Sequence, residues 1–123
     1  MSFIFVALGG ALGALARYAI SLIPMKVEFP VLTLVTNIIG AVLIGFVVGF
    51  ASNRENVSEN AVLFWKTGVC GGFTTFSTFS LEAFNLLESK RYLAGGSYIA
   101  LSVACCIVGV ICGKKLAMLI RGF

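Results

Sequence analysis

The sequence predicts an all-α membrane protein of four transmembrane helices, the third broken in its middle. The chain has 123 residues, of which 59% are hydrophobic and 11% charged, and its mean hydropathy is +1.05. A soluble domain carries about 25% charged residues, so this chain has too little polar surface for a water-facing globule. One membrane-spanning helix takes roughly 20 apolar residues. We therefore expect residues 1–123 to form a single transmembrane domain.

The composition also excludes several classes of function. The chain has no His and five acidic residues, which removes most metal sites, catalytic triads and paired-acid active sites. We therefore do not expect an enzyme. The net charge of +4 is scattered along the chain and forms no basic stripe for nucleic acid. The cysteines lie in apolar context without a CxxC pair, so we interpret them as packing residues of membrane helices: Cys70, Cys105, Cys106 and Cys112.

The first two spans are simple apolar stretches. Residues 3–23 form the first, interrupted only by Arg17 and ended by Pro24. It is not read as a signal peptide, because no basic residue precedes it and a second span follows at once. Residues 31–51 form the second span and contain no charge. At about 1.5 Å per residue this stretch covers roughly 30 Å of hydrocarbon.

The third apolar stretch, residues 61–87, follows a polar connection and differs from the others. Its centre holds the paired glycines Gly71 and Gly72, followed by five hydroxyl residues within residues 74–80. This composition disfavours an unbroken helix. Bare backbone at membrane depth is tolerated only when it is buried in protein or lines a wet cavity. We therefore predict a discontinuous span at this point.

The fourth span covers residues 92–112 and is expected to end at Gly113-Lys114-Lys115. Four spans place both termini on one side of the membrane. Basic residues are nearly balanced between the sides, with Arg54, Lys66, Lys114, Lys115 and Arg121 on the terminal side against Arg17, Lys26, Lys90 and Arg91. The positive-inside rule needs a clear bias to fix orientation, so single chains are expected to insert both ways round.

Small residues support close helix association. Gly9 with Gly13, Gly45 with Gly49, and Gly109 with Gly113 have the GxxxG spacing that lets helix backbones approach. Four thin spans bury little polar backbone by themselves, which favours an oligomer, and a dimer is its simplest closed form. With the balanced charges, this predicts an antiparallel, dual-topology homodimer.

Polar groups inside spans tend to face the protein interior or a pathway. Thr33 and Asn37 share one face of the second span, and Tyr98, Ser102 and Cys106 follow one another at four-residue steps on the fourth. A single Ser or Thr can bond to its own helix, whereas the Asn37 amide needs a partner within or across the helices.

Two aromatic and two charged residues have open roles. Phe76 and Phe79 are three apart and form either core packing or ring edges that stabilise a small anion. Arg17 either snorkels to the interface or supplies a positive potential at a pore mouth. Glu82 is a cap, the partner of a cation or part of a pathway. The polar residues are rich in donors and nearly free of charge, which suits a small anion bound weakly enough to leave.

Three motifs resemble the Fluc (CrcB) fluoride channel family: GALARY at residues 13–18, NIIG at residues 37–40 and GGFTTFSTFS at residues 71–80. The similarity extends over the whole chain in length, span number and motif order. It implies a fluoride-selective passive channel in the bacterial plasma (inner) membrane, built as an antiparallel homodimer with two fluoride pathways. Such a channel lets fluoride leave the cytoplasm after it has entered as HF.

The resemblance also implies roles for single residues. Backbone carbonyls of Gly71 and Thr74 would hold a structural sodium ion (Na+), not transported, at the dimer interface. The fluoride pathway would include Asn37, Thr75, Phe76, Ser77, Thr78, Phe79, Tyr98 and Ser102. Arg17, Thr33 and Glu82 would be vestibule or supporting residues. Cys106 stands where the family usually has Ser, and a thiol is a weaker donor than a hydroxyl.

Two other hypotheses are weighed against this one. A small multidrug-resistance-type exchanger also has four spans and dual topology, but its proton chemistry needs a carboxylate in the first span. The first span here has none, and Glu82 in the third is the only candidate. A non-transporting subunit of a larger complex would not need a donor-lined, broken span.

Overall fold

The computed structural model describes residues 1–52 and 54–121, with the backbone alone at Arg121. Within these residues all regular structure is helical and no strand occurs. Asn53, expected in the polar connection, lies outside the described residues, as do Gly122 and Phe123 of the expected C-terminal tail.

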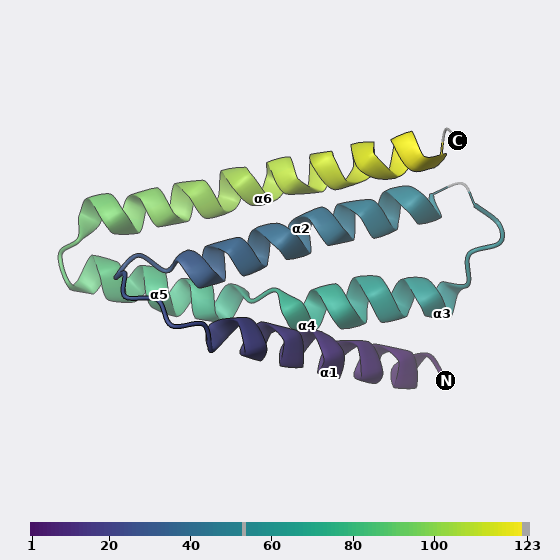
Figure 1. Cartoon of the computed structure of the whole chain (residues 1–123), viewed down its shortest axis with the longest axis horizontal. Helices are drawn as coiled ribbons and strands as arrows, with labels where there is room; N and C mark the ends of the chain where they lie inside the picture. The colour runs from purple at the N-terminus through teal and green to yellow at the C-terminus, as the bar shows by residue number, and fades with distance from the viewer. Residues whose placement is uncertain (53, 122–123) are drawn as a thin grey trace.

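In the described part of the chain, three helices are long and apolar enough to cross a membrane: α1 (Ser2–Ser21), α2 (Val31–Ala51) and α6 (Tyr92–Arg121). The N-terminus and the C-terminal end of α6 lie at one end of the molecule (Figure 1). In the most apolar window of each helix, 11%, 22% and 17% of the residues, in that order, are buried inside the chain. Apolar surface left exposed on this scale belongs against lipid or a partner rather than water. The chain is therefore an all-α membrane protein.

The segment between α2 and α6 is built from shorter helices: α3 (Glu59–Val62), the π-helix η1 (Leu63–Cys70), α4 (Gly71–Phe73) and α5 (Phe76–Glu88). The interruption lies at Thr74 and Thr75, whose backbones are extended with ψ angles of 156° and 114°. The sequence predicts a discontinuity in this region. The paired glycines themselves are helical, and the helix ends at Phe73, one residue after them.

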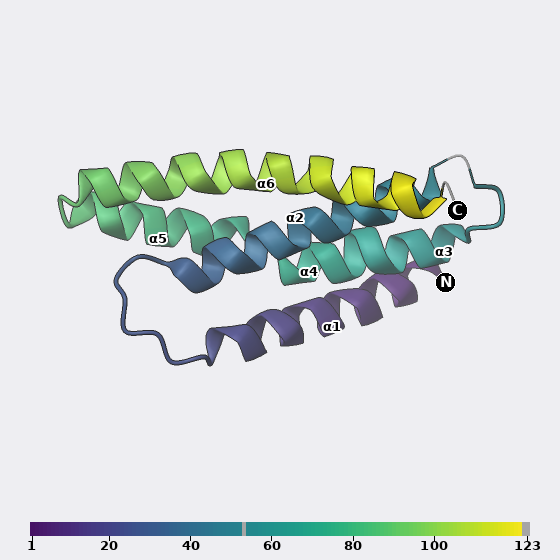
Figure 2. The same ribbon diagram turned by 45° about the horizontal axis from the view of Figure 1, so that its top comes forward.

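The interruption changes the packing partner of the segment. Before it, η1 and α4 pack against α1; after it, α5 packs against α6, and the two views agree on this arrangement (Figures 1 and 2). The α5–α6 contact forms a core cluster of Phe79, Ala83, Leu86 and Tyr98. The most extensive contact between two helices is that of α2 with α6.

The GxxxG glycines are used inside the chain. A Cβ atom on Gly13 would meet the backbone of Val69, and one on Gly45 would meet the backbone of Val110. The glycines therefore bring α1 close to η1, and α2 close to α6, backbone to backbone. The expectation that the GxxxG spacing lets helix backbones approach is confirmed for these helix pairs within one chain.

Helix α6 is longer than expected. It continues through Gly113-Lys114-Lys115 to Arg121, although the sequence predicts an end at these residues. A Cβ on Gly113 would meet the backbone of Val42 and Phe46, so this glycine seats α6 on α2 rather than ending it. Packing of this kind outweighs the helix penalty of about 1 kcal/mol for a glycine, and lysine is itself a good helix former.

Candidate functional site

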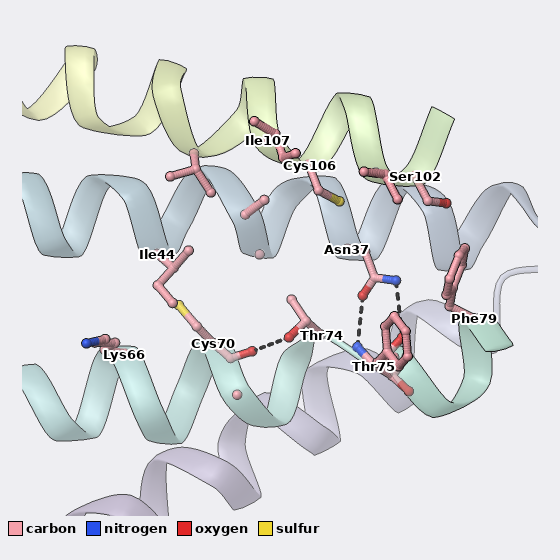
Figure 3. A pocket seen from close by; sticks show the side chains of 16 residues that line it. Asn37, Ile44, Lys66, Cys70, Thr74, Thr75, Phe79, Ser102, Cys106 and Ile107 are labelled. Atoms are coloured by element: carbon pink, nitrogen blue, oxygen red, sulfur yellow. Dashed lines mark hydrogen bonds between the residues drawn. The ribbon is translucent and has the colours of Figure 1, made fainter. Parts of the chain in front are cut away.

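A cavity of about 450 Å³ lies between α2, α6 and the broken segment (Figure 3). Neutral polar residues line it from three elements, namely Asn37 of α2, Thr74 and Thr75 at the interruption, and Ser102 of α6. The side chains of Phe76 and Phe79 of α5 also line the cavity. No carboxylate is found among the lining residues in the described part of the chain. The cavity therefore offers hydrogen-bond donors and aromatic rings without negative charge.

Asn37 fixes the interruption from the neighbouring helix. Its Oδ1 accepts a hydrogen bond from the Thr75 backbone N–H at 2.8 Å, and its Nδ2 donates to the Thr75 carbonyl at 3.2 Å, as the dashed lines in Figure 3 show. Both backbone groups of an extended residue are thereby paired, as buried backbone requires. The Asn37 amide carries two donor hydrogens, so one is left for another acceptor.

Thr75 also begins the second half of the segment. Its Oγ1 accepts a hydrogen bond from the Thr78 backbone N–H at 3.1 Å and caps α5 in the way that Ser and Thr commonly do. The Ser77 hydroxyl lies 3.3 Å from the same Oγ1. Neither Ser77 nor Thr78 lines the cavity, so the structure places both next to the site, at the start of α5.

These hydrogen bonds release two backbone carbonyls. In a continuous helix, the Thr75 N–H would bond to the Gly71 carbonyl and the Thr78 N–H to the Thr74 carbonyl. Here the first N–H bonds to Asn37 and the second to the Thr75 side chain. Carbonyls of unwound membrane helices are typical ligands of Na+, so the donor chemistry of Gly71 and Thr74 fits a sodium ion. Among the described residues no cluster of three or more His, Cys, Asp or Glu side chains offers an alternative metal site.

Arg17 supports the same interruption from α1. Its Nε donates to the Gly72 carbonyl at 3.1 Å, where a cation also complements the C-terminal end of a helix. The Cys70 carbonyl accepts from the Thr74 hydroxyl at 2.9 Å. Arg17 does not line the cavity, so the structure places it behind the interruption, bonded to its backbone.

The polar stripe of α6 divides into two environments. Ser102 lines the cavity and is 7% exposed, yet its Oγ has no hydrogen-bond partner among the described residues. A buried unpaired hydroxyl costs about 1–3 kcal/mol and indicates an ion or water that completes it. Cys106, one turn further on, lines the same cavity. Tyr98 is fully buried outside it and donates its hydroxyl to Glu82 Oε1 at 3.3 Å.

The two phenylalanines differ in their surroundings. Their ring centroids lie 5.5 Å apart, but Phe79 is 9% exposed and packs against Tyr98 at 5.1 Å, whereas Phe76 is 79% exposed. The Phe79 ring is therefore held in place by the core, and Phe76 projects from the chain. Thr33 and Glu82 do not line the cavity.

The sequence reasoning did not assign Lys66 or Cys70 to the site, although both line the cavity. Lys66 entered the sequence reasoning only as one of the balanced charges. Its spacing of four and five residues from Cys70 and Gly71 was the available signal. That signal becomes informative only when the packing of this stretch against α2 is known.

The fold and the cavity define a helical membrane protein with a donor-lined cavity beside a broken helix. The described lining residues include no carboxylate, an arrangement suited to a small anion. Residues 4–114 match the model of the family described as CrcB-like protein, Camphor Resistance (CrcB). The chain belongs to this family.

Several relatives with the name fluoride-specific ion channel FluC are similar over nearly their whole length. The protein of Clostridium perfringens is 42% identical over 120 residues, which cover 95% of this chain and 94% of the relative. That of Ruminiclostridium cellulolyticum is 44% identical over 115 residues, 91% and 88% of the two chains. That of Methanococcus maripaludis is 41% identical over 116 residues, 94% of each.

Proposed function

We propose that this protein is a fluoride-selective passive ion channel that exports fluoride and lowers its cytoplasmic concentration. The observation that carries the proposal is the buried Ser102 hydroxyl, which has no partner among the described residues and lines a cavity without carboxylates. Fluoride is a small anion and a strong hydrogen-bond acceptor, so it would complete this donor. The relatives carry the name of a fluoride-specific channel and not of an enzyme.

The surrounding residues suit passage rather than tight binding. Ser102 and the remaining Asn37 N–H are neutral donors, and the positive edge of the Phe79 ring adds a weak attraction for an anion. Conduction needs sites that bind well enough to admit an ion and weakly enough to release it. In this proposal Phe76, Thr75, Ser77 and Thr78 belong to the same route near the interruption. Tyr98 supports the route by holding the Phe79 ring.

The proposed assembly is an antiparallel, dual-topology homodimer in the bacterial plasma membrane. The broken segment would be a fourth crossing, which agrees with the N-terminus and the C-terminal end of α6 lying at one end (Figure 1). The exposed Phe76 side chain gives a second subunit an apolar surface beside the cavity. A structural sodium ion would be held between the subunits by the released carbonyls of Gly71 and Thr74.

No observation favours the exchanger hypothesis. An exchanger of that type needs a titrating carboxylate in its transport site. Glu82 is the only carboxylate on the apolar stretches of the sequence, and it accepts a hydrogen bond from Tyr98 without lining the cavity.

The test is anion flux from liposomes that contain the purified protein. We expect fast fluoride efflux with chloride largely excluded, and a several-fold slower fluoride efflux for Ser102→Ala. Protein-free liposomes give the background leak. Equal flux of the two anions, or no flux of either, would contradict the proposal.

A further inference from the structure

Lys66 is the one charged residue among those that line the cavity in the described part of the chain. Arg17, the other cation near the interruption, is bonded to the Gly72 carbonyl and lies outside the lining. The only ion pair between described residues joins Arg91 to Glu28, so no described carboxylate neutralises the Lys66 ammonium. A fixed positive charge therefore borders a cavity whose other polar groups are neutral.

The charge and the neutral donors lie at opposite ends of the cavity. Asn37 and Ile44 both line it from α2, and their separation of seven positions in the sequence corresponds to roughly 10 Å along a helix. In Figure 3, Lys66 lies at the Ile44 end, whereas Ser102 and Phe79 lie at the other end with Asn37 between. The ammonium is thus separated from the Ser102 hydroxyl by most of the length of the cavity.

The π-helix accounts for Lys66, Cys70 and Gly71 lining the cavity together. Helix η1 covers Leu63–Cys70, and the i→i+5 pattern of a π-helix brings residues four and five apart onto one side. Lys66, Cys70 and Gly71 all line the cavity, in agreement with that pattern. In a regular α-helix, Lys66 and Gly71 would point in clearly different directions, because five residues are well over one turn of 3.6.

We propose that the positive charge of Lys66 attracts fluoride and raises its concentration at the Ile44 end of the cavity. We call this the collector role of Lys66. This inference rests on the proposed channel function. Ile44 and Val110 line the same cavity, and low-dielectric walls beside a charge of one sign focus its field and raise the local concentration of the counter-ion. Because the charge is remote from Ser102, it attracts the anion without holding it at the donor site. Lys66 thus affects how often fluoride enters the cavity. The neutral donors, Ser102 and Asn37, determine which anion is selected.

The experiment compares fluoride efflux from liposomes for wild type, Lys66→Gln, Lys66→Arg and Lys115→Gln. Lys115 is a matched control, because its replacement removes one charge from the same end of the molecule without touching the cavity lining. At about 0.01 M ionic strength, where the Debye length is about 30 Å, we expect Lys66→Gln to slow efflux by about 3–10-fold. Lys66→Arg and Lys115→Gln should stay within about twofold of wild type.

The salt dependence separates a field effect from a structural one. In about 1 M potassium gluconate the Debye length falls to about 3 Å, and the Lys66→Gln and wild-type rates should converge to within about twofold. Wild-type rates for Lys66→Gln at low salt, or a deficit that persists at high salt or in Lys66→Arg, would overturn the collector role. Absence of fluoride flux in wild type itself would instead contradict the channel proposal. Elution of each variant at the wild-type volume in detergent shows that it has folded.

Discussion

Individual side chains replace the helical hydrogen bonds that the broken segment gives up. Asn37 pairs both backbone groups of Thr75, and Thr75 in turn caps α5 through its hydroxyl. Arg17, on α1, donates a hydrogen bond to the Gly72 carbonyl. Extended backbone can therefore stay in the interior of a membrane protein, where unpaired groups are costly. The released carbonyls of Gly71 and Thr74 are a consequence of this exchange.

Asn37→Ala should destabilise the protein by about 1–3 kcal/mol, because it leaves the Thr75 N–H without its partner and removes the Asn37 hydrogen bond to the Thr75 carbonyl. Fluoride efflux should fall as well, since the start of α5 loses its anchor. The control is Thr33→Ala, one turn earlier on the same face of α2 and outside the cavity lining. Unfolding in mixed SDS micelles measures the difference. Equal stability of the two variants would show that Asn37 does not hold the interruption.

Phe79→Ile should slow fluoride efflux several-fold while the protein keeps its oligomeric state, because the substitution removes the ring edge but retains bulk. Phe84→Ile is the matched control, since Phe84 lies on the same helix, is 59% exposed and does not line the cavity. Liposome flux and elution volume report the two properties. Wild-type flux in Phe79→Ile would remove the argument for an anion–ring contact.

At the level of elements, the interruption lets one segment pack against two different helices. Its first half lies on α1 and its second half on α6. Two glycines of the first half make this packing possible. A Cβ on Gly72 would meet the Gly10 carbonyl of α1. A Cβ on Gly68 would lie 2.8 Å from the Cα atom of Gly9, also on α1. The glycines are therefore required for the close approach of two helices. The extended backbone of Thr74 and Thr75 is where the segment changes its packing partner from α1 to α6.

Gly72→Ala should destabilise the protein by about 1–3 kcal/mol, because the added methyl group meets backbone that has no room to move aside. Gly96→Ala is the control within a helix, since a Cβ at Gly96 has nothing within 4 Å and should gain up to about 1 kcal/mol of helix propensity. The two unfolding midpoints should move in opposite directions. A stable Gly72→Ala variant would contradict the close α1–α4 contact.

The sequence was sufficient for features that depend on local pattern. Apolar length predicted the residues of α2, and the glycine and hydroxyl composition predicted an interruption near Thr74. Features set by tertiary contact were not accessible. The continuation of α6 past Gly113 depends on its seat against α2, and the partner of Arg17 depends on the α1–α4 approach. Lys66 was missed because its place in the cavity depends on the packing of η1 against α2, which the sequence does not indicate.

At the scale of the whole molecule, two properties bear on its assembly: a large apolar surface and the distribution of a few basic residues. Most of the three long helices is unburied within the chain, so lipid or a partner must cover it. Basic residues divide nearly evenly between the two sides, five against four, so we propose that the orientation of insertion is unbiased. An antiparallel pair of chains in the membrane follows as the proposal from these two properties.

Two lysines added after Phe123 should bias insertion toward one orientation and reduce the amount of active antiparallel dimer. The effect arises because the terminal side would then carry a clear excess of positive charge. Two glutamines added at the same position are the control. Fluoride efflux per unit of reconstituted protein measures the loss, and unchanged efflux would show that the charge balance does not set orientation.

The most direct test of the central claim, that the cavity beside the broken helix conducts fluoride and rejects chloride, is the reversal potential of the current in a planar bilayer. Opposed tenfold gradients of fluoride and chloride separate the two equilibrium potentials, each about 59 mV from zero. The account predicts a current that reverses close to the fluoride potential. Reversal near zero or near the chloride potential would contradict it.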